Sequence, residues 1–191
     1  GNGANCINRP TVETACATHC LEGGITFTSQ AQIDAFPTMY PGCTKIWGNV
    51  TIDEAVAGNI TNLNRLAQVM EIEGYLIIDN NAALTNLSGL NGLNSIGGYL
   101  AIYYNGALIN LSGLNGLTSI IGYLAIYSNE ALINLSGLNG LTSIGDGLYI
   151  NNNDVLISLT DLNGLSSIDG SLFINNNAAL GNLSGLNGFT L

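Results

Sequence analysis

Apolar residues recur every 24 residues between Leu76 and Phe189, so that the same positions of each repeat are apolar. One column consists of leucines: Leu76, Leu100, Leu124, Leu148 and Leu172. A second column consists of isoleucines: Ile78, Ile102, Ile126, Ile150 and Ile174. A fixed period of roughly 20 to 50 residues is typical of solenoids, in which each coil buries its apolar face against its neighbours. We therefore expect a solenoid.

Each repeat has two halves with different periods. The first half, as in residues 99–103, alternates apolar and polar positions with a period of two, which predicts a β-strand. The second half, as in residues 108–120, has a period of three, and its intervening Asn, Ser and Gly residues are poor helix formers. We expect short extended pieces joined by tight corners, with parallel strands stacked from coil to coil. The predicted fold class is an all-β solenoid, a parallel β-helix.

The N-terminal part of the chain predicts a cap on this solenoid. Residues 1–47 lack the repeat, and residues 48–191 form five full coils plus a partial last coil, the first being offset by 26 residues with two extra residues in the loop 53–59. Ser29 and Gln32 are spaced as a capping box, which predicts a helix from Gln30 to about Phe36, ended by Pro37.

All four cysteines lie in the first 43 residues, which indicates disulfides and an oxidising compartment. We expect Cys20–Cys43, because each residue precedes an apparent strand, and with it Cys6–Cys16. The alternative is a metal site at Cys16, His19 and Cys20, whose spacing suits zinc poorly. No other metal or cofactor is expected, except for an alternative calcium site near Asp146 and Asp169, where the simpler reading is turn-forming aspartates.

The unit Gly-x-Leu-x-Ile-x-x-Asn, followed by Leu at every third position, resembles leucine-rich repeats and, more closely, the receptor L-domain type of β-helix. The stretches Thr28-Ser29-Gln30 and 40–44 resemble those of secreted repeat proteins of the Bacteroidota type. The resemblance covers essentially the whole chain. It implies an extracellular location, secreted or on the cell surface, and it brings no catalytic residues.

Composition excludes several function classes. The formal net charge is −10 and the chain has only three Lys and Arg residues, so a nucleic-acid partner is not expected. No apolar run approaches the ~20 residues of a membrane span. With a single histidine and oxidised cysteines, the chain has no Ser-His or Cys-His combination that could act as nucleophile and general base. We therefore expect that the protein is not an enzyme. The chain begins at Gly1, as expected after removal of a signal peptide.

Asparagine forms further columns in the repeat. The columns beginning at Asn81 and Asn91 predict ladders of side-chain amides between coils or to the turn backbone. Several asparagines also match the N-glycosylation pattern: Asn49, Asn59, Asn86, Asn110, Asn134 and Asn182. Glycans on coils about 5 Å apart would crowd one another, so these matches are expected to be by-products of the repeat in most coils.

The outward positions of the strands carry aromatic residues, and we expect them to form a binding or assembly face. These candidates are Tyr75, Tyr99, Tyr103, Tyr123, Tyr127, Tyr149 and Phe173. The alternative is that outward strand positions favour tyrosine by propensity alone.

The last coil stops part-way, which predicts an open end formed by Leu186, Phe189 and Leu191. These features favour a structural or adhesive protein whose partner is itself, in a homo-oligomer or a head-to-tail filament. The alternative is a module that binds glycans or surface proteins through the tyrosine face. A more distant alternative is ice binding by the regular Ser95, Ser119, Ser143 and Ser167 column.

Overall fold

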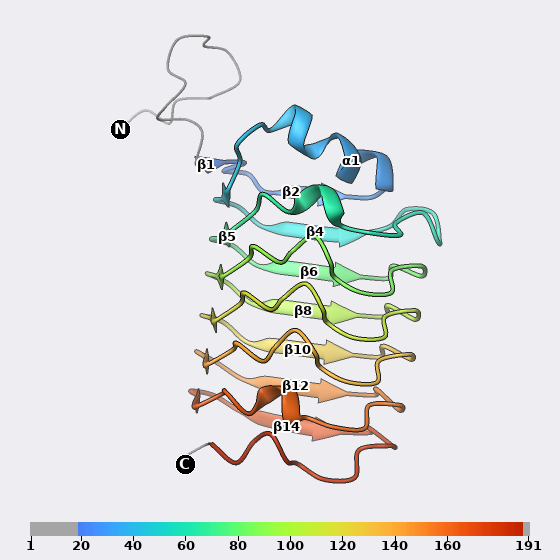
Figure 1. Ribbon diagram of the computed structural model, residues 1–191, viewed down its shortest axis with the longest axis vertical. Helices are drawn as coiled ribbons and strands as arrows, with labels where there is room; N and C mark the ends of the chain where they lie inside the picture. The colour runs from blue at the N-terminus through green and yellow to red at the C-terminus, as the bar shows by residue number, and fades with distance from the viewer. Residues whose placement is uncertain (1–18, 189–191) are drawn as a thin grey trace.

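The computed structural model describes residues 19–188, and these residues form a stack of coils with a helix over the first one (Figure 1). Each coil contributes one strand to each of two parallel sheets, so the predicted fold class, a parallel β-helix, is confirmed. The core runs through the stack, and its apolar columns are almost entirely excluded from solvent as far as Leu165.

The wide sheet is built from strands of three or four residues, which pair in the parallel order β14-β12-β10-β8-β6-β4-β2. Their bounds are β2 Ile25–Phe27, β4 Val50–Asp53, β6 Leu76–Asp79, β8 Leu100–Tyr103, β10 Leu124–Tyr127, β12 Leu148–Asn151 and β14 Leu172–Asn175. The register sets each leucine of the 24-residue column beside the next, as Leu100 lies beside Leu124. Because inward side chains stack directly on one another, each coil buries the face of its neighbour.

The narrow sheet consists of two-residue strands on another side of the coil, in the order β1-β3-β5-β7-β9-β11-β13. Their bounds are β1 His19–Cys20, β3 Lys45–Ile46, β5 Glu71–Ile72, β7 Ser95–Ile96, β9 Ser119–Ile120, β11 Ser143–Ile144 and β13 Ser167–Ile168. In β7, β9 and β11 the isoleucine points inward and the serine lies half-buried on the outer side. The outward serine column that raised the ice-binding alternative therefore belongs to this sheet.

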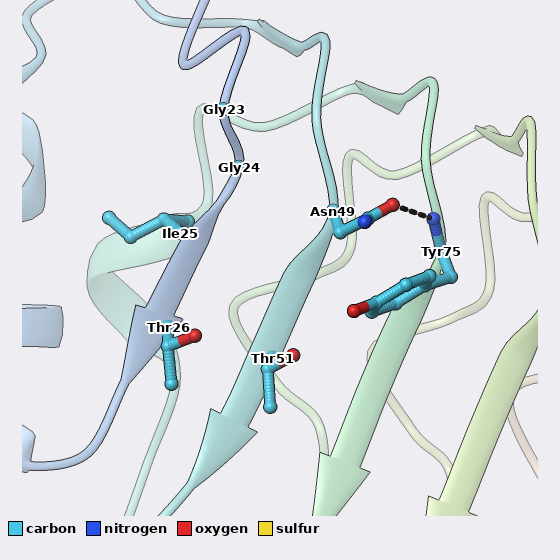
Figure 2. Close-up of a pocket in the computed structure, with 7 residues that line it drawn as sticks. All are labelled: Gly23, Gly24, Ile25, Thr26, Asn49, Thr51 and Tyr75. Atoms are coloured by element: carbon cyan, nitrogen blue, oxygen red, sulfur yellow. Dashed lines mark hydrogen bonds between the residues drawn. The ribbon is translucent and has the colours of Figure 1, made fainter.

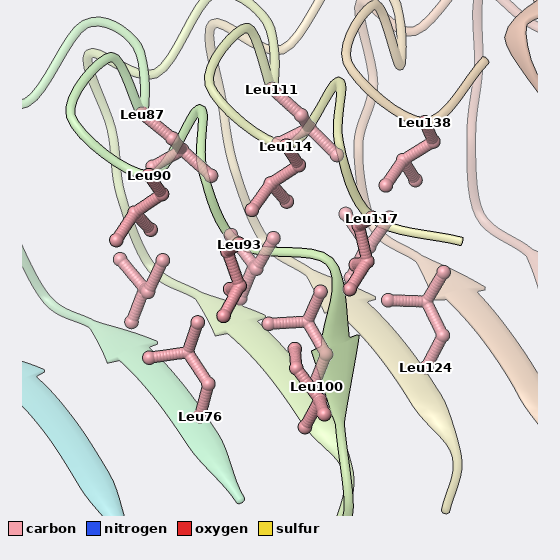
Figure 3. Close-up of a cluster of buried hydrophobic side chains, with 14 of the residues drawn as sticks. Leu76, Leu87, Leu90, Leu93, Leu100, Leu111, Leu114, Leu117, Leu124 and Leu138 are labelled. Carbon is pink, nitrogen blue, oxygen red and sulfur yellow. The ribbon is translucent and has the colours of Figure 1, made fainter. Parts of the chain in front are cut away.

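The period-three half of each coil is extended, as predicted, and its leucines point into the core (Figure 3). A tight corner lies at Gly113, where φ is +122° and an added Cβ would lie 1.9 Å from the carbonyl oxygen of Leu87. Two coils have Arg65 or Asp161 at this position, and there the chain forms short 3-10 turns, η2 Asn64–Leu66 and η3 Thr160–Leu162. A side chain at this corner thus changes the local conformation without changing the coil.

Helix α1, Gln30–Met39, covers the first coil by burying Ile33 and Phe36. The predicted end at Pro37 is wrong, because the helix continues and the N–H of Tyr40 donates to the carbonyl oxygen of Phe36. Burial of Phe36 against the Phe27 ring, at 5.7 Å between ring centroids, outweighs the local preference against helix before proline.

The predicted capping box at the start of α1 is also wrong in detail. Ser29 occupies the N-cap position but makes no side-chain cap bond. The Gln32 Oε1 atom instead accepts from the N–H of Thr28, one residue earlier than expected, at 2.6 Å. Asn59 supplies the missing cap, because its Oδ1 accepts from the N–H of Gln30 at 2.8 Å. A residue of the next coil therefore ties the cap to the solenoid.

The Cys20–Cys43 disulfide is confirmed, with 5.7 Å between the two Cα atoms. Cys20 is therefore not a thiolate ligand, which removes it from the alternative metal site with Cys16 and His19. Cys6, Cys16 and the predicted Cys6–Cys16 bond lie outside the described residues. The disulfide indicates folding in an oxidising compartment, as in the secretory pathway.

The first coil is offset by 26 residues, as predicted, since Val50 lies beside Leu76. Its longer loop is held by Glu54, which is only 4% exposed. The carboxylate accepts backbone N–H bonds from Gly58 at 2.6 Å, Ile60 at 2.8 Å and Ala82 at 2.7 Å. Burial alone would raise the pKa of Glu54, but these N–H donors lower it below its ordinary value.

The predicted ladder at Asn81, Asn105, Asn129, Asn153 and Asn177 is confirmed. The Nδ2 of Asn129 donates to the carbonyl oxygens of Ile102 and Tyr127 at 3.0 and 3.1 Å. Its Oδ1 accepts from the backbone N–H of Asn105 at 3.1 Å. In the second column the predicted bonds to the turn backbone are found, because the Asn115 Oδ1 accepts from the N–H of Gly113 within its own turn. Asn115 is exposed, and no bond from it to a neighbouring asparagine of its column is found among the described residues.

Candidate binding face

The outward side of the wide sheet carries two rows of tyrosines. Residues alternate sides along a strand, so the buried Leu100 and Ile102 place Tyr99 and Tyr103 on the outer side, one at each end of β8. The 24-residue register repeats this placement in neighbouring coils. The first row is Tyr75, Tyr99 and Tyr123, and the second row is Tyr103 and Tyr127.

The rings within each row stack on one another along the solenoid axis. In the first row, ring centroids lie 4.8 Å apart for Tyr75 and Tyr99 and 4.4 Å apart for Tyr99 and Tyr123, with interplanar angles of 18° and 7°. In the second row, Tyr103 and Tyr127 lie 5.4 Å apart at 9°. The spacing follows from the ~4.8 Å separation of hydrogen-bonded strands. Stacking therefore uses ring faces that would otherwise be open to a partner.

The two rows close over the alanines between them. Ala101 and Ala125 point outward, yet they are 0% and 1% exposed. These two alanines are therefore closed to solvent and are not part of the exposed surface of the face. Burial first, and then electrostatic interaction and hydrogen bonding with Tyr123, raises the pKa of Tyr103. Contact between residues of different rows fits a continuous aromatic layer.

One end of the first row is covered and the other is open. The Tyr149 ring meets Tyr123 edge-on, at 6.0 Å and 85°, and so closes the row on the C-terminal side. On the N-terminal side, Tyr75 borders a shallow depression of about 190 Å³ (Figure 2). Its lining residues are Gly23, Gly24, Ile25, Thr26, Asn49, Thr51 and Tyr75.

Backbone geometry holds the floor of this depression. Gly24 has φ of +79°, and a Cβ at this position would lie 2.3 Å from the carbonyl oxygen of Asn49. The N–H of Ile25 donates to the same carbonyl at 2.8 Å. The Asn49 side chain is fixed as well, because its Oδ1 accepts from the N–H of Tyr75 at 3.1 Å. The Asn49 amide is thus oriented by its neighbours, with its oxygen engaged in the protein.

Two aspartates lie in the column of the second row. Asp53 pairs with Asp79 in the register, and Asp79 in turn pairs with Tyr103. Burial and then the charge of Asp53 raise the pKa of Asp79, against a smaller opposing effect of the N–H of Asn80. The Oδ1 atom of Asp79 is buried and has no hydrogen-bond partner. The tyrosine face therefore has an acidic border at its N-terminal end.

The remaining predicted residues lie at the C-terminal end of the stack. Phe173 on β14 pairs with Tyr149 and is 51% exposed. Leu172 is 46% exposed, whereas the leucines of its column in earlier coils are buried. Leu186 is half-buried against the core, and Phe189 and Leu191 lie outside the described residues.

The candidate glycosylation sites have two kinds of environment. Four of them form local turns, in which the asparagine Oδ1 accepts from the N–H of the serine two residues later. These four are Asn86, Asn110, Asn134 and Asn182. The other two bind distant segments, since Asn49 contacts Tyr75 and Asn59 caps α1. Glycosylation itself stays a prediction.

Acidic groups elsewhere are used in the fold or exposed. Asp146 and Asp169 are both exposed, and residues 19–188 contain no group of three or more His, Cys, Asp or Glu residues arranged for a metal ion. Asp161 instead binds the preceding coil, where it accepts from the N–H of Leu135 at 3.1 Å. No helix in this same range is long and apolar enough to cross a membrane.

Comparison with known families agrees with this architecture. Residues 42–109 match the family model of the Receptor L domain. The matched segment runs from Gly42, next to the second cysteine of the disulfide, to residue 109 in the coil of β8, and it contains Tyr75, Tyr99 and Tyr103. A search among curated proteins found no match. The Receptor L domain is a non-catalytic binding or structural repeat module.

Sequence reasoning found the tyrosines but missed the depression and the acidic border. Both depend on the 26-residue offset of the first coil, which places Thr51 and Asp53 beside residues of the regular repeat. An alignment of the first coil at this offset, extended to every outward position, would have shown Asp53 next to Asp79. The depression also needs Gly23 and Gly24, which precede the repeat and carry no periodic signal.

Proposed function

We propose that this protein is an extracellular, non-enzymatic binding module that uses the outward face of its wide sheet. The observation that supports this proposal is the pair of tyrosine rows, which are half-exposed and buried only in part against the sheet. Tyrosine offers a rigid apolar ring with a polar tip, and such residues are enriched at binding surfaces. The partner is an extended, uncharged or basic molecule, because the border of the face is acidic.

The rings themselves limit how a partner binds. Interior rings such as Tyr99 stack on both sides, so they present edges and hydroxyl groups rather than free faces. A partner that lies across several coils would therefore contact ring edges and hydroxyl groups over the covered alanines. This arrangement favours a broad contact with a protein or a polysaccharide chain over repeated stacking of single sugars.

The test is binding to immobilised polysaccharides and extracellular proteins, measured by biolayer interferometry. The double variant Tyr103→Ala/Tyr127→Ala should weaken binding at least tenfold, because truncating a central aromatic residue of an interface typically costs about 1–3 kcal/mol. The matched control is Ile133→Ala/Ile157→Ala, since these residues are 41% and 56% exposed in the other half of the coil. Equal binding by wild type and the tyrosine double variant would reject this face.

Self-association is the second candidate function, supported by the exposed apolar side chains of the last described coil. Leu172, Phe173 and Leu183 are 46%, 51% and 52% exposed, and β14 pairs with a strand on one side only in the described chain. In a head-to-tail filament, α1 of the next copy would cover this coil. The outer side of α1 carries the exposed polar residues Gln32, Asp34 and Thr38, which match an apolar partner poorly.

Light scattering across a concentration series tests this second candidate. Self-association through the last coil predicts a mass that rises with concentration in the wild type and returns to that of a monomer in Phe173→Ser. Phe27→Ser would disturb the core, so the matched surface control is Tyr104→Ser, an aromatic residue that is 63% exposed in the middle of the stack. A monomer at every concentration would exclude the assembly.

A further inference from the structure

The corner that leads from the period-three half of a coil into the narrow sheet carries an Asn-Gly step in the regular coils. These steps are Asn91-Gly92, Asn115-Gly116, Asn139-Gly140, Asn163-Gly164 and Asn187-Gly188. The leucines on either side of a step, such as Leu114 and Leu117, point into the core (Figure 3). The asparagine between them is exposed, so its side-chain amide is open to water. Asn163 ends the 3-10 turn η3 and Asn187 lies near the end of the described chain, so the first three steps are the comparable ones.

The stacking of the coils requires the glycine of each step. A Cβ at Gly116 would lie 2.9 Å from the carbonyl oxygen of Asn91 in the preceding coil. The glycine therefore has no side chain that shields its backbone nitrogen. Within residues 19–188, no hydrogen bond from the N–H of Gly92, Gly116 or Gly140 is found. An unbonded peptide nitrogen thus directly follows an exposed amide.

These two groups can react with each other without an enzyme, since asparagine is among the thermolabile residues. The glycine nitrogen loses its proton to hydroxide and attacks the asparagine Cγ. The bond from Cγ to Nδ2 breaks, and the nitrogen takes up a proton from water and leaves as ammonia, so that a cyclic succinimide remains. Water then opens the ring at either carbonyl group, which gives aspartate or isoaspartate. The net reaction consumes water, releases ammonia and adds a negative charge to the chain.

The first three corners differ in how their amides are held. No hydrogen bond of the Asn91 side chain is found in the described part of the chain. The Oδ1 of Asn115 accepts from the N–H of Gly113 at 3.1 Å, and its Nδ2 stays available. Asn139 uses both ends of its amide, because its Oδ1 accepts from a turn N–H at 3.2 Å and its Nδ2 donates to the Oδ1 of Asp161 at 3.1 Å.

Asp161 opposes the reaction at Asn139 in two ways. Its carboxylate holds Nδ2, which is the group that must leave. Its charge also disfavours loss of the proton from the N–H of Gly140, because the nitrogen would become an anion near a carboxylate. The Asp161 side chain is itself fixed, since it accepts from the N–H of Leu135 at 3.1 Å and from the hydroxyl of Ser136 at 3.4 Å. The carboxylate is therefore held at this corner.

We infer that Asn91 and Asn115 are sites of spontaneous deamidation and that Asp161 protects Asn139 from the same reaction. Conversion adds negative charges on neighbouring coils, about 4.8 Å apart, to a column of neutral side chains. The corner leads into the narrow sheet and not into the wide one, so the tyrosines of the binding face keep their contacts. The inference goes beyond the proposed binding function and does not depend on it.

The test is incubation of the folded protein in mildly alkaline buffer, with conversion at each step measured by peptide mapping and mass spectrometry. We expect conversion at Asn91 and Asn115 to be about threefold or more faster than at Asn139. The reference is the same chain unfolded in guanidinium chloride, in which the three steps should react at similar rates. The inference is overturned if neither Asn91 nor Asn115 reacts in the folded protein, or if Asn139 reacts as fast as they do.

Asp161→Asn tests the protection directly, because it removes the charge and keeps an oxygen that can accept from Leu135. Conversion at Asn139 should rise about threefold or more, while conversion at Asn91 stays unchanged. The matched control is Asp154→Asn, which makes the same change at an exposed aspartate of the same coil. Unchanged conversion at Asn139 would overturn the inference. An equal rise at all three steps would indicate unfolding in place of lost protection, and would overturn it as well.

The double variant Asn91→Ala/Asn115→Ala tests the two sites themselves. The first coil has Ala67 at the position of Asn91, so this corner accommodates alanine. Ion-exchange chromatography separates the products, because each conversion makes the protein more acidic. The acidic species that form first in the wild type should be missing from the double variant. Their formation at the wild-type rate would place the reaction at other residues and overturn the inference.

Discussion

Two ladders run along this solenoid with the same 24-residue period, one of asparagines inside the coil and one of tyrosines outside. Inside, the amide of Asn129 uses its hydrogen-bonding groups on neighbouring backbone and on the next asparagine. Outside, the tyrosines stack on one another but stay half-exposed, and Tyr75 borders a cavity. The 24-residue period alone does not distinguish a structural column from a functional one. The two differ in what folding leaves available: the asparagine amides are hydrogen-bonded within the protein, whereas the tyrosine side chains keep exposed surface and hydroxyl groups for a partner.

The largest expected effect is the loss of one amide from the inner ladder. Asn129→Ala leaves the N–H of Asn105 and the carbonyl oxygen of Ile102 without partners in the core, while the carbonyl oxygen of Tyr127 keeps the N–H of Tyr104 as a donor. We expect a loss of about 3–5 kcal/mol in the free energy of unfolding. Chemical denaturation followed by circular dichroism measures it. The matched control is the exposed Asn115→Ala, for which we expect less than about 1 kcal/mol. Similar losses in both variants would contradict a structural role specific to the inner column.

An interruption of the outer ladder should cost less. Tyr99→Ala removes two stacking contacts and uncovers Ala101, and each aromatic pair contributes about 0.5–1.5 kcal/mol. We expect a loss of about 1–3 kcal/mol by the same denaturation assay, with unchanged circular dichroism of the folded state. A loss as large as that of Asn129→Ala would mean that the tyrosines serve mainly to hold the coils together.

The smallest effect concerns the acidic border. The folded-state pKa of Asp79 is raised by burial and by Asp53, so its neutral form is favoured by folding, and stability falls as pH rises from the unfolded-state pKa of about 3.9 through the higher folded-state pKa. Asp79→Asn removes this loss. We expect a gain of about 0.5–1 kcal/mol at pH 7, or roughly 1–4 °C in Tm, and none at pH 3.

Calorimetry at the two pH values measures this difference. Asn151 occupies the same column on β12, so the wide sheet already accommodates asparagine at this position. Glu54 contributes a pH dependence of stability of the opposite sign. Because its pKa is lowered in the folded state, its contribution to the free energy of unfolding is present at neutral pH and is lost as pH falls through the folded-state pKa. A gain of equal size at pH 3 would show that Asp79→Asn acts through packing and not through charge.

The sequence predicts most of this fold because the same apolar position occurs again in each coil, so that several copies support one assignment. Five equivalent leucines place the wide sheet, and the offset of the first coil is readable from Val50 and Leu76. Predictions from local sequence were wrong where contacts with distant residues determine the structure. Helix α1 continues through Pro37 because Phe36 is buried. Asn59, from the next coil, caps the helix in place of Ser29.

The binding face was predictable in part. Its tyrosines follow from the alternation along β8 and β10, but their mutual stacking, which removes most ring faces from the solvent, requires the rotamers that packing selects. The depression depends on residues from three strands, of which only Tyr75 lies in the regular repeat. Segments outside the 24-residue repeat occur only once in the chain, so no equivalent segment supports a prediction of their conformation. The sequence alone therefore does not predict their contacts.

The glycine corners give the molecule an adjustable length. Because Gly113 and its equivalents let each coil pass closely over the last, a coil is a complete unit, and loss or duplication of 24 residues would bring identical neighbours together at the new junction. Removing one middle coil would shorten the wide sheet by about 4.8 Å and remove a ring from the first row, while the N-terminal edge with Tyr75 would keep its neighbours β2 and β4. The length of the tyrosine face and the set of residues at its N-terminal edge can therefore change independently during evolution.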